Sequence, residues 1–494
     1  MIYVNLIGHD IKYEVYQLIK VFYFHEEIIF IEDLDDYKEG ILIINRLDDF
    51  NGEIKSSTRI YEENNLIYEG SIDNIEKIKV EKSHIKKKIR IGIKQNIYEG
   101  LNSLSRIKAP WGILTGIRPV KIVHSLLDEG IGDEEILNIL VKEYKLFHQK
   151  ANLILNIGKE QRKYLYPLDD NRFSLYVSIP FCPTRCLYCS FPSLSIGKYG
   201  DFVDIYVDKL VYEIDRIGEL MKNKTISTVY IGGGTPSAIS SKDLEKIIHS
   251  IYNNFDRKDI EEITVEAGRP DTINVEMLRM LKRNDIDRIS INPQTMNDST
   301  LKLIGRQHSS QDIINTYYEA RNIGFHVINM DLIIGLPSEG IKQVRTTLDS
   351  IEDLNPENLT VHTLSVKKGS KFIGTMNQYR IENQNIIEEM LNETKVFAEK
   401  MDLNPYYLYR QKQIVGNFEN IGYSKKGKEC IYNIKMMEEK ETVIGAGMGA
   451  VSKIFFPKED RIERVPNVKS LKEYLNRVDE MIERKSYILS VNSQ

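Results

Sequence analysis

The 494-residue chain has few cysteines and tryptophans, four and one respectively, and no excess of positive charge. Its formal net charge is −5, so the general attraction to polyanions that nucleic-acid-binding proteins use is not expected. No apolar run reaches the roughly 18–20 residues that span a bilayer, and the first ten residues are not typical of a secretory signal. Four cysteines cannot stabilise so long a chain through disulfides, which indicates a reducing cytoplasm.

The length suggests about three domains, and the pattern of β-like and helix-like segments changes twice along the sequence. Residues 1–165 mix short β-like runs with helix-like segments and predict an accessory α+β domain of unknown role. Residues 172–370 alternate regularly between the two patterns, and residues 371–494 predict a mainly helical C-terminal region. No internal repeat or low-complexity tract is found.

The middle region contains six β-like runs, with a helical pattern after each of the first five. The runs are residues 174–179, 228–231, 263–266, 288–292, 327–334 and 359–364. The right-handed crossover rule turns such an order into a parallel sheet. Polar or glycine residues fall near the C-terminal end of every run, where parallel α/β enzymes build their sites. Because these positions would converge as a ring, the pattern predicts an incomplete (β/α)6 barrel.

Three of the four cysteines, Cys182, Cys186 and Cys189, lie within eight residues. Clustered thiolates bind soft metals: either zinc, which needs a fourth ligand nearby, or an iron–sulfur cluster. Three thiolates on a four-iron cluster leave one iron open to chelate a cofactor, which is a catalytic arrangement. The remaining Cys430 lies far along the chain, and we expect it to be buried and inert.

The Cys-x3-Cys-x2-Cys spacing, with Tyr188 before the last cysteine, resembles the signature of the radical S-adenosylmethionine (SAM) enzymes. That resemblance implies a [4Fe-4S] cluster on the three cysteines, SAM as cofactor, and a radical that abstracts hydrogen from the substrate. Family members hold the amino group of SAM at a glycine-rich edge after the second strand, whose backbone can approach a ligand closely. The corresponding residues here are Gly232, Gly233, Gly234 and Thr235.

Further segments narrow the resemblance to the oxygen-independent coproporphyrinogen III dehydrogenase (oxidase) family, over about residues 172 to 460. They are residues 176–182, 265–271, 290–295, 305–308 and 329–337. The overall length and three segments, residues 111–121, 406–412 and 430–433, are most similar to the clostridial and bacillar branch of this family. Carried over residue by residue, the resemblance implies that the SAM ribose and carboxylate are bound by Glu266, Gln294, Arg306 and Asp331.

Family chemistry is the oxidative decarboxylation of two propionates of coproporphyrinogen III to vinyl groups, a step of porphyrin and heme biosynthesis. The resemblance therefore implies a tetrapyrrole substrate and a low-potential electron donor such as flavodoxin or ferredoxin. Residues 371–494 would cover the substrate, and its propionates call for cations. Arg410 and Lys412 are candidates, although the same tyrosine-rich stretch could equally be a solvated edge.

Two departures leave the exact substrate open. Phe191 stands where enzymes proven for this reaction have a fourth cysteine, and Ser178 stands where many relatives have histidine. The competing hypothesis is the heme-chaperone branch, whose His-Asn-x-x-Tyr-Trp motif corresponds here to Tyr432-Asn433-x-x-Met436-Met437. A heme carrier needs an axial ligand, and the expected histidine is Tyr432, so we favour the dehydrogenase. A radical SAM enzyme for another tetrapyrrole and a non-catalytic zinc scaffold are further alternatives.

Overall fold

The structure is a computed structural model that describes residues 1–24, 26–50, 53–73, 82–365, 384–411 and 418–492. The chain divides into two compact units, Met1–Gly158 and Lys159–Gln494, which are described separately. The expected boundary at residues 370–371 and the candidate cation Lys412 lie outside the described residues. None of the described helices is both long enough and apolar enough to cross a membrane.

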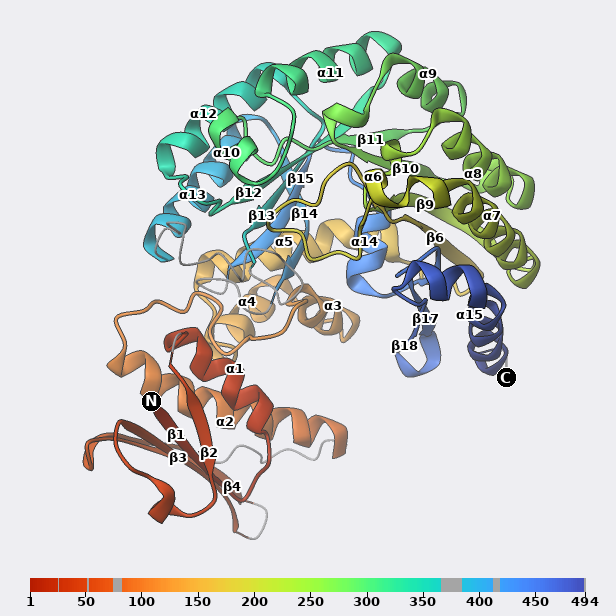
Figure 1. The fold of residues 1–494 in the computed structure, drawn as a ribbon. Coiled ribbons are helices and arrows are strands. Elements are labelled where there is room, and N and C mark those ends of the chain that lie inside the picture. Colours follow the sequence, from red (N-terminus) through yellow and green to blue (C-terminus); the bar gives the residue numbers. More distant parts are fainter. Residues whose placement is uncertain (25, 51–52, 74–81, 366–383, 412–417, 493–494) are drawn as a thin grey trace. The chain divides into compact units, whose positions relative to one another are not determined.

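The first unit has a five-stranded sheet in the order β2-β1-β3-β4-β5, in which β1 is parallel to both of its neighbours (Figure 1). Its strands are β1 Ile2–Ile7, β2 Ile28–Ile31, β3 Ile41–Phe50, β4 Glu53–Glu62 and β5 Asn65–Ile72. Its helices are α1 Lys12–Phe22, α2 Lys82–Leu104, α3 Val120–Asp128 and α4 Asp133–Lys142, and α5 (His148–Leu165) runs on into the second unit. Helix α2 packs on β4 and β5, so this unit is α+β as expected.

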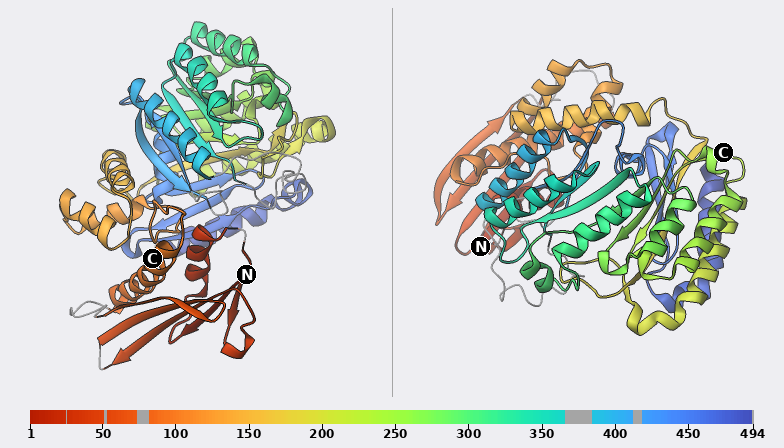
Figure 2. Two further views of the ribbon diagram at one scale, coloured as in Figure 1. Left: turned by 90° about the vertical axis from the view of Figure 1, so that its left-hand side faces the viewer. Right: turned by 90° about the horizontal axis from the view of Figure 1, so that it is seen from above.

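The second unit is built on one sheet of eleven strands, whose centre is the predicted parallel arrangement. Six parallel strands lie side by side in chain order: β6 Arg172–Ile179, β9 Thr225–Gly233, β10 Glu262–Gly268, β11 Arg288–Ile291, β12 Val327–Ile334 and β13 Asn358–Thr363. The helices between them are α7 Val203–Leu220, α8 Ser241–Asn254, α9 Val275–Arg283, α10 Asp298–Leu303, α11 Ser310–Ile323 and α12 Ile341–Leu354. The helices lie along the outside of the curved sheet (Figures 1 and 2), which confirms the incomplete (β/α)6 barrel.

The C-terminal region extends this sheet at both edges. Strands β14 (Asn404–Arg410) and β15 (Glu419–Ser424) add to β13 in antiparallel order, whereas β16 (Thr442–Ala446) pairs parallel with β6. Beyond β16 follow β17 Val451–Phe456 and β18 Arg461–Pro466. Helices α13 Gln384–Lys400, α14 Ile431–Glu438 and α15 Leu471–Asn492 make up most of the regular structure here. The mainly helical character of the C-terminal region is as expected, whereas its strands β14 to β18 were not expected.

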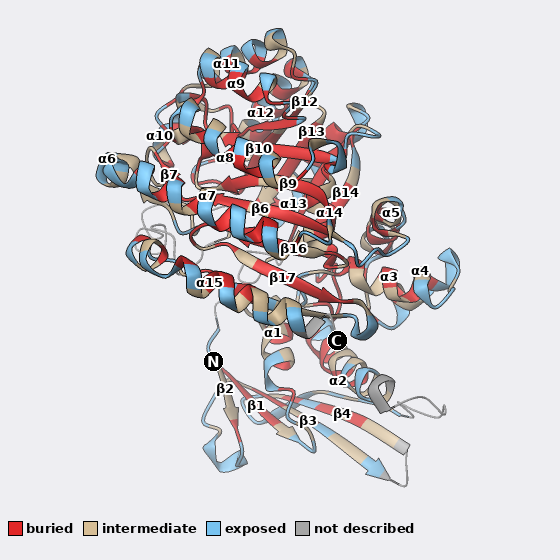
Figure 3. Cartoon of the chain, turned by 90° about the vertical axis from the view of Figure 1, so that its right-hand side faces the viewer, coloured by how far each residue is buried: buried red, intermediate tan, exposed pale blue. Residues whose placement is uncertain are grey.

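The strands of the barrel are covered on both faces, which explains their continuous apolar runs. All four residues of β11 are buried, as are the inward-facing Met277, Leu278 and Leu281 of α9. Figure 3 shows the resulting layers, with buried strands inside and exposed helix faces outside. A barrel core of this kind leaves the C-terminal ends of the strands free to carry functional side chains.

Helix α14 inserts an aromatic side chain against the strands of the barrel. The Tyr432 ring stacks on Tyr230 of β9, with ring centroids 4.6 Å apart, and on Tyr176 of β6 at 6.2 Å. Cys430, which precedes α14, is buried, and its Sγ donates to Glu262 Oε1 at 3.2 Å. Because Glu262 is the first residue of β10, Cys430 lies at the N-terminal end of the parallel strands.

Candidate functional site

The cysteine loop, residues 181–190, follows β6 directly and lies at the C-terminal end of the parallel strands. Cys182 ends the short strand β7 (Phe181–Cys182), which pairs with β8 (Leu194–Ser195). Cys182 and Cys186 are buried and Cys189 is half-buried, and all three thiols are free of disulfides. The three thiols therefore lie on one loop, at the end of the barrel where parallel α/β proteins have their functional sites.

Two neighbouring residues of the loop, Leu187 and Tyr188, anchor it to the barrel. Leu187 donates its backbone N–H to the Ile304 carbonyl at 3.0 Å, and Leu187 and Tyr188 both pack on an apolar cluster. That cluster consists of Ile304, Ile333, Leu336 and Leu364. The aromatic residue before the last cysteine thus has a packing role that holds Cys186 and Cys189 in place.

The thiols are in a desolvated environment. Burial raises the pKa of the Cys182 thiol to about 11, and burial also raises the pKa of Cys189. The Thr235 hydroxyl lies 3.5 Å from Cys182 Sγ, and Arg269 Nη1 lies 3.8 Å from Cys186 Sγ. Thiolate is the form of cysteine that binds metal. A metal centre that binds to these three cysteines would therefore displace their thiol protons.

The glycine edge, residues 232–235, passes against the start of the cysteine loop at the end of β9. A Cβ on Gly234 would lie 2.7 Å from the Phe181 carbonyl oxygen, and one on Gly232 would lie 2.7 Å from Glu266 Oε2. Gly233 has φ +109°, a conformation that side chains with a Cβ rarely adopt. Gly233 and Gly234 therefore have to be glycine, Gly233 for its backbone conformation and Gly234 for its packing against backbone atoms.

Glu266, in the C-terminal half of β10, and Asp331, within β12, are acids in electrostatic range of each other. Loss of hydration and the Asp331 carboxylate raise the pKa of Glu266 to about 8, although a hydrogen bond from the Gly233 N–H opposes the shift. Gln294 joins this group through its backbone: its N–H donates to the Asp331 carbonyl at 2.9 Å. Gln294 has φ 68°, an uncommon conformation of the kind that clusters at functional sites.

Arg306 lies against the cysteine loop and not in the outer helical layer. Its Nη1 donates to the Asn292 carbonyl at 2.5 Å and its Nη2 to the Tyr188 hydroxyl at 3.2 Å. The guanidinium is buried and within electrostatic range of Cys186. The structure thus brings this cation to the side of the loop that carries two of the cysteines.

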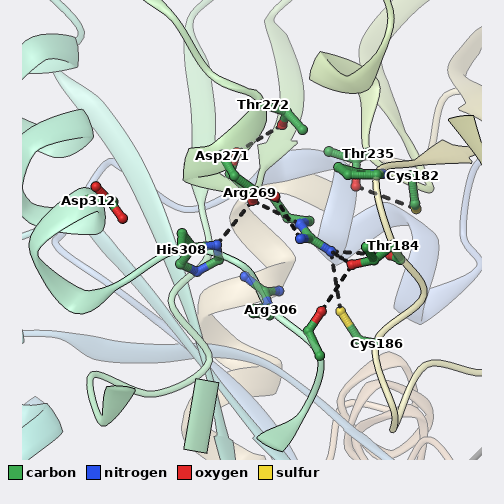
Figure 4. A network of polar contacts seen from close by, with 12 residues as sticks. Cys182, Thr184, Cys186, Thr235, Arg269, Asp271, Thr272, Arg306, His308 and Asp312 are labelled. Carbon is green, nitrogen blue, oxygen red and sulfur yellow. Dashed lines mark hydrogen bonds and ion pairs between the residues drawn. The ribbon is translucent and has the colours of Figure 1, made fainter. Parts of the chain in front are cut away.

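A second cation, which the sequence analysis did not single out, contacts the loop directly. Arg269 follows β10, is buried, and donates to Thr184 Oγ1 at 2.9 Å as well as to Cys186. Asp271 accepts from Arg269 and from His308 Nδ1 (Figure 4). These residues fall within segments of family resemblance, but the contacts of Arg269 with Thr184 and Cys186 and of Asp271 with His308 join distant parts of the sequence, so no local signal marks them.

The remaining expected positions are placed as follows. Arg410 is buried rather than part of a solvated edge, and burial lowers its pKa to about 10 against the attraction of Glu419. Ser178 donates its hydroxyl to the Met448 carbonyl at 2.9 Å, while Phe191 is exposed. His362 of β13, whose role the sequence leaves undefined, has Nε2 3.8 Å from an Asp331 oxygen.

The residues present fit an iron–sulfur cluster by the chemistry of their donors. Three free thiols on one loop are the donor set that such a cluster takes, and two buried guanidinium groups beside them suit an anionic centre. Among the described residues, no group of three or more His, Cys, Asp or Glu side chains is arranged to hold a single metal ion. The glycine edge and the neighbouring acids offer hydrogen-bonding groups to a ligand beside the thiols.

Comparison with known proteins agrees with this geometry. The radical SAM superfamily profile matches residues 176–351. The oxygen-independent coproporphyrinogen-III oxidase-like protein HemZ of Bacillus subtilis (strain 168) is 42% identical over 391 residues, which cover 78% of each chain. The heme chaperone HemW of the same strain is 30% identical over 278 residues, covering 56% of this chain and 70% of HemW.

A solved structure shares the fold. The coproporphyrinogen III oxidase HemN from Escherichia coli, described as a radical SAM enzyme, matches with a TM-score of 0.52 and 24% identity. The match covers 66% of this chain and 73% of HemN. By its sequence and its barrel, the chain therefore belongs to the radical SAM superfamily, among the oxygen-independent coproporphyrinogen-III oxidase-like proteins.

Proposed function

We propose that this protein is a radical SAM oxidoreductase that oxidatively decarboxylates propionates of coproporphyrinogen III to vinyl groups, as a step of porphyrin and heme biosynthesis in the cytoplasm. The observation that carries the proposal is the position of the three free thiols beside the glycine edge and the acids at one end of the barrel. A [4Fe-4S] cluster and SAM bound there would supply an electron and a hydrogen-abstracting radical. A low-potential donor such as flavodoxin or ferredoxin would provide that electron, and a separate one-electron acceptor would take up the electron that is left on the substrate when carbon dioxide leaves.

The chain's own residues then divide the work of binding. Cys182, Cys186 and Cys189 hold the cluster. Gly232, Gly233 and Gly234 of the glycine edge carry no side chain of their own, so their backbone would take the amino group of SAM at close range. The remaining contacts to the SAM ribose and carboxylate come from Glu266, Gln294, Arg306 and Asp331. Glu266 and Asp331 belong to β10 and β12, Gln294 follows β11, and Arg306 lies in the segment between α10 and α11.

The heme-chaperone alternative draws support from the similarity to HemW, but the local geometry disfavours it. Tyr432 stands at the position of the expected histidine, and its ring is stacked between barrel strands. Cys430 is buried and hydrogen-bonded to Glu262 at the N-terminal end of the strands. A group enclosed in this way cannot serve as an axial heme ligand without rearrangement.

Anaerobic incubation with SAM, a reductant and coproporphyrinogen III tests the proposal. We expect mass loss from the tetrapyrrole corresponding to decarboxylation, together with release of carbon dioxide, and neither product with Cys186→Ala. Tight stoichiometric heme binding without carbon dioxide release would reverse the choice and favour the chaperone. SAM cleavage that depends on a different tetrapyrrole would retain the enzyme class and change the substrate.

A further inference from the structure

Arg269 has an unusual position for a buried cation, because one end of its guanidinium faces a cysteine sulfur. Nη1 lies 3.8 Å from Cys186 Sγ, 2.9 Å from Thr184 Oγ1 and 3.2 Å from the Thr184 carbonyl oxygen. The Arg269 side chain is only 4% exposed. Little solvent therefore screens the charge of this group from the sulfur.

The opposite edge of the guanidinium is fixed by a carboxylate. Nε and Nη2 of Arg269 donate to the two oxygens of Asp271 at 3.0 and 2.7 Å. Although burial acts to raise it, hydrogen bonds from His308 and Arg269 hold the pKa of Asp271 well below its usual range. This fork keeps Asp271 charged and leaves Nη1 free to point toward the cysteine loop (Figure 4).

We propose that Arg269, oriented by Asp271, is a positioning residue that raises the reduction potential of the cluster by donating an N–H···S hydrogen bond to Cys186. The inference rests on the proposed function, in which Cys186 is a cluster ligand. Hydrogen bonds to the ligand sulfurs and the local net charge are two of the factors that set the potential of an iron–sulfur cluster. Both act in the same direction here, because a positive donor stabilises the more negative, reduced state.

The fork geometry explains why the nearby carboxylate does not cancel this effect. Asp271 occupies the Nε–Nη2 edge, so the sulfur meets the guanidinium first and the carboxylate behind it. Arg306, the other buried guanidinium near the loop, donates to the Asn292 carbonyl and the Tyr188 hydroxyl. Among the described residues, Arg269 is the arginine that donates to a cysteine sulfur of the loop.

The test is a redox titration of the full-length, anaerobically reconstituted protein, followed by electron paramagnetic resonance of the reduced cluster. We compare wild type with Arg269→Gln and Arg269→Lys, and we measure iron and acid-labile sulfide in each sample. Arg321→Gln is the matched control. Arg321 also pairs with a carboxylate, because its Nη2 donates to both oxygens of Glu357, but it lies before β12, at the opposite end of the strands.

At one fixed solution potential, we expect the ratio of reduced to oxidised cluster in Arg269→Gln to fall about tenfold, equivalent to about 59 mV for a one-electron couple. Arg269→Lys keeps the charge but not the fork, so its ratio should fall less. Arg321→Gln should match wild type. Wild-type midpoints in both Arg269 variants at full iron content would overturn the inference and leave the proposed function intact.

Two further outcomes are decisive. If both Arg269 variants fold, as judged by circular dichroism, yet retain no iron, Arg269 is a brace for the cysteine loop and the tuning role is wrong. If wild-type protein itself holds no cluster, the proposed function fails, and the inference fails with it.

Discussion

At the scale of single residues, Glu266 carries the clearest consequence of its surroundings. Its raised pKa, about 8, means that the folded protein prefers the protonated carboxyl. For an acid with a raised pKa, the native state binds more protons than the unfolded state between the two pKa values. Stability therefore falls as pH rises from the unfolded value through about 8.

We predict that Glu266→Gln removes this loss. At pH 9 the substitution should raise the free energy of unfolding by roughly 2 kcal/mol, whereas near pH 4 it should change little. Urea unfolding at the two pH values measures the difference. Glu276→Gln, on the exposed face of α9, is the control and should show no such pH dependence. An equal effect of Glu266→Gln at both pH values would contradict the assigned pKa.

Arg410 and Arg269 show what residue-level reasoning could and could not reach. Arg410 is conspicuous in a tyrosine-rich segment, yet it is buried. Arg269 is inconspicuous in sequence, but the fold brings it to Thr184 and Cys186, 85 and 83 residues earlier. Long-range partners of this kind depend on the register of the sheet, which no local pattern of residues encodes.

At the scale of elements, Gly234 of the glycine edge should not tolerate a side chain. Gly234→Ala would place a Cβ 2.7 Å from the Phe181 carbonyl oxygen and 2.8 Å from the Pro180 carbonyl carbon, both backbone atoms. We predict a loss of about 2 kcal/mol in unfolding free energy, together with weaker SAM binding. Gly116→Ala, which meets nothing within 4 Å, should be neutral. Calorimetry of unfolding and of SAM binding measures both effects.

Helix α14 gives a prediction in which two substitutions at one position act in opposite directions. Tyr432 is buried, and in the described part of the chain its hydroxyl has no hydrogen-bond partner. Tyr432→Phe should therefore raise the unfolding free energy by about 1 kcal/mol, because it removes an unsatisfied polar group. Tyr432→Ala should lower it by about 3–5 kcal/mol, because the stack on Tyr230 and Tyr176 is lost. Destabilisation by the phenylalanine substitution would show that the hydroxyl has a partner after all.

At the scale of the whole molecule, the barrel was predictable and its extensions were not. The six parallel strands are long or strongly apolar, and each alternates with an amphipathic helix, so periodicity alone locates them. The C-terminal strands β14, β15 and β16 are tyrosine-rich or short, and β15 and β16 pair with the distant strands β13 and β6. In the first unit, β4 and β5 carry many charged and polar residues, which hides their strand pattern.

The candidate site, too, has a part that the sequence predicts directly and a part that it does not. Cysteine spacing and the glycine run indicate chemistry by themselves, because few other uses need those residue types in that order. The expected SAM contacts follow from resemblance. The structure brings Glu266 to the glycine edge, within electrostatic range of Asp331, and brings Arg306 to the cysteine loop. Their roles toward SAM remain predictions.

The central claim is that Cys182, Cys186 and Cys189 hold a cluster that cleaves SAM. Its most direct test is the formation of 5′-deoxyadenosine by anaerobically reconstituted protein with SAM and dithionite, measured by liquid chromatography and mass spectrometry. We predict 5′-deoxyadenosine from wild type and from Cys430→Ala, whose residue lies at the other end of the strands, and none from Cys186→Ala. Wild-type levels from Cys186→Ala, or no product from an iron-loaded wild-type protein, would contradict the account.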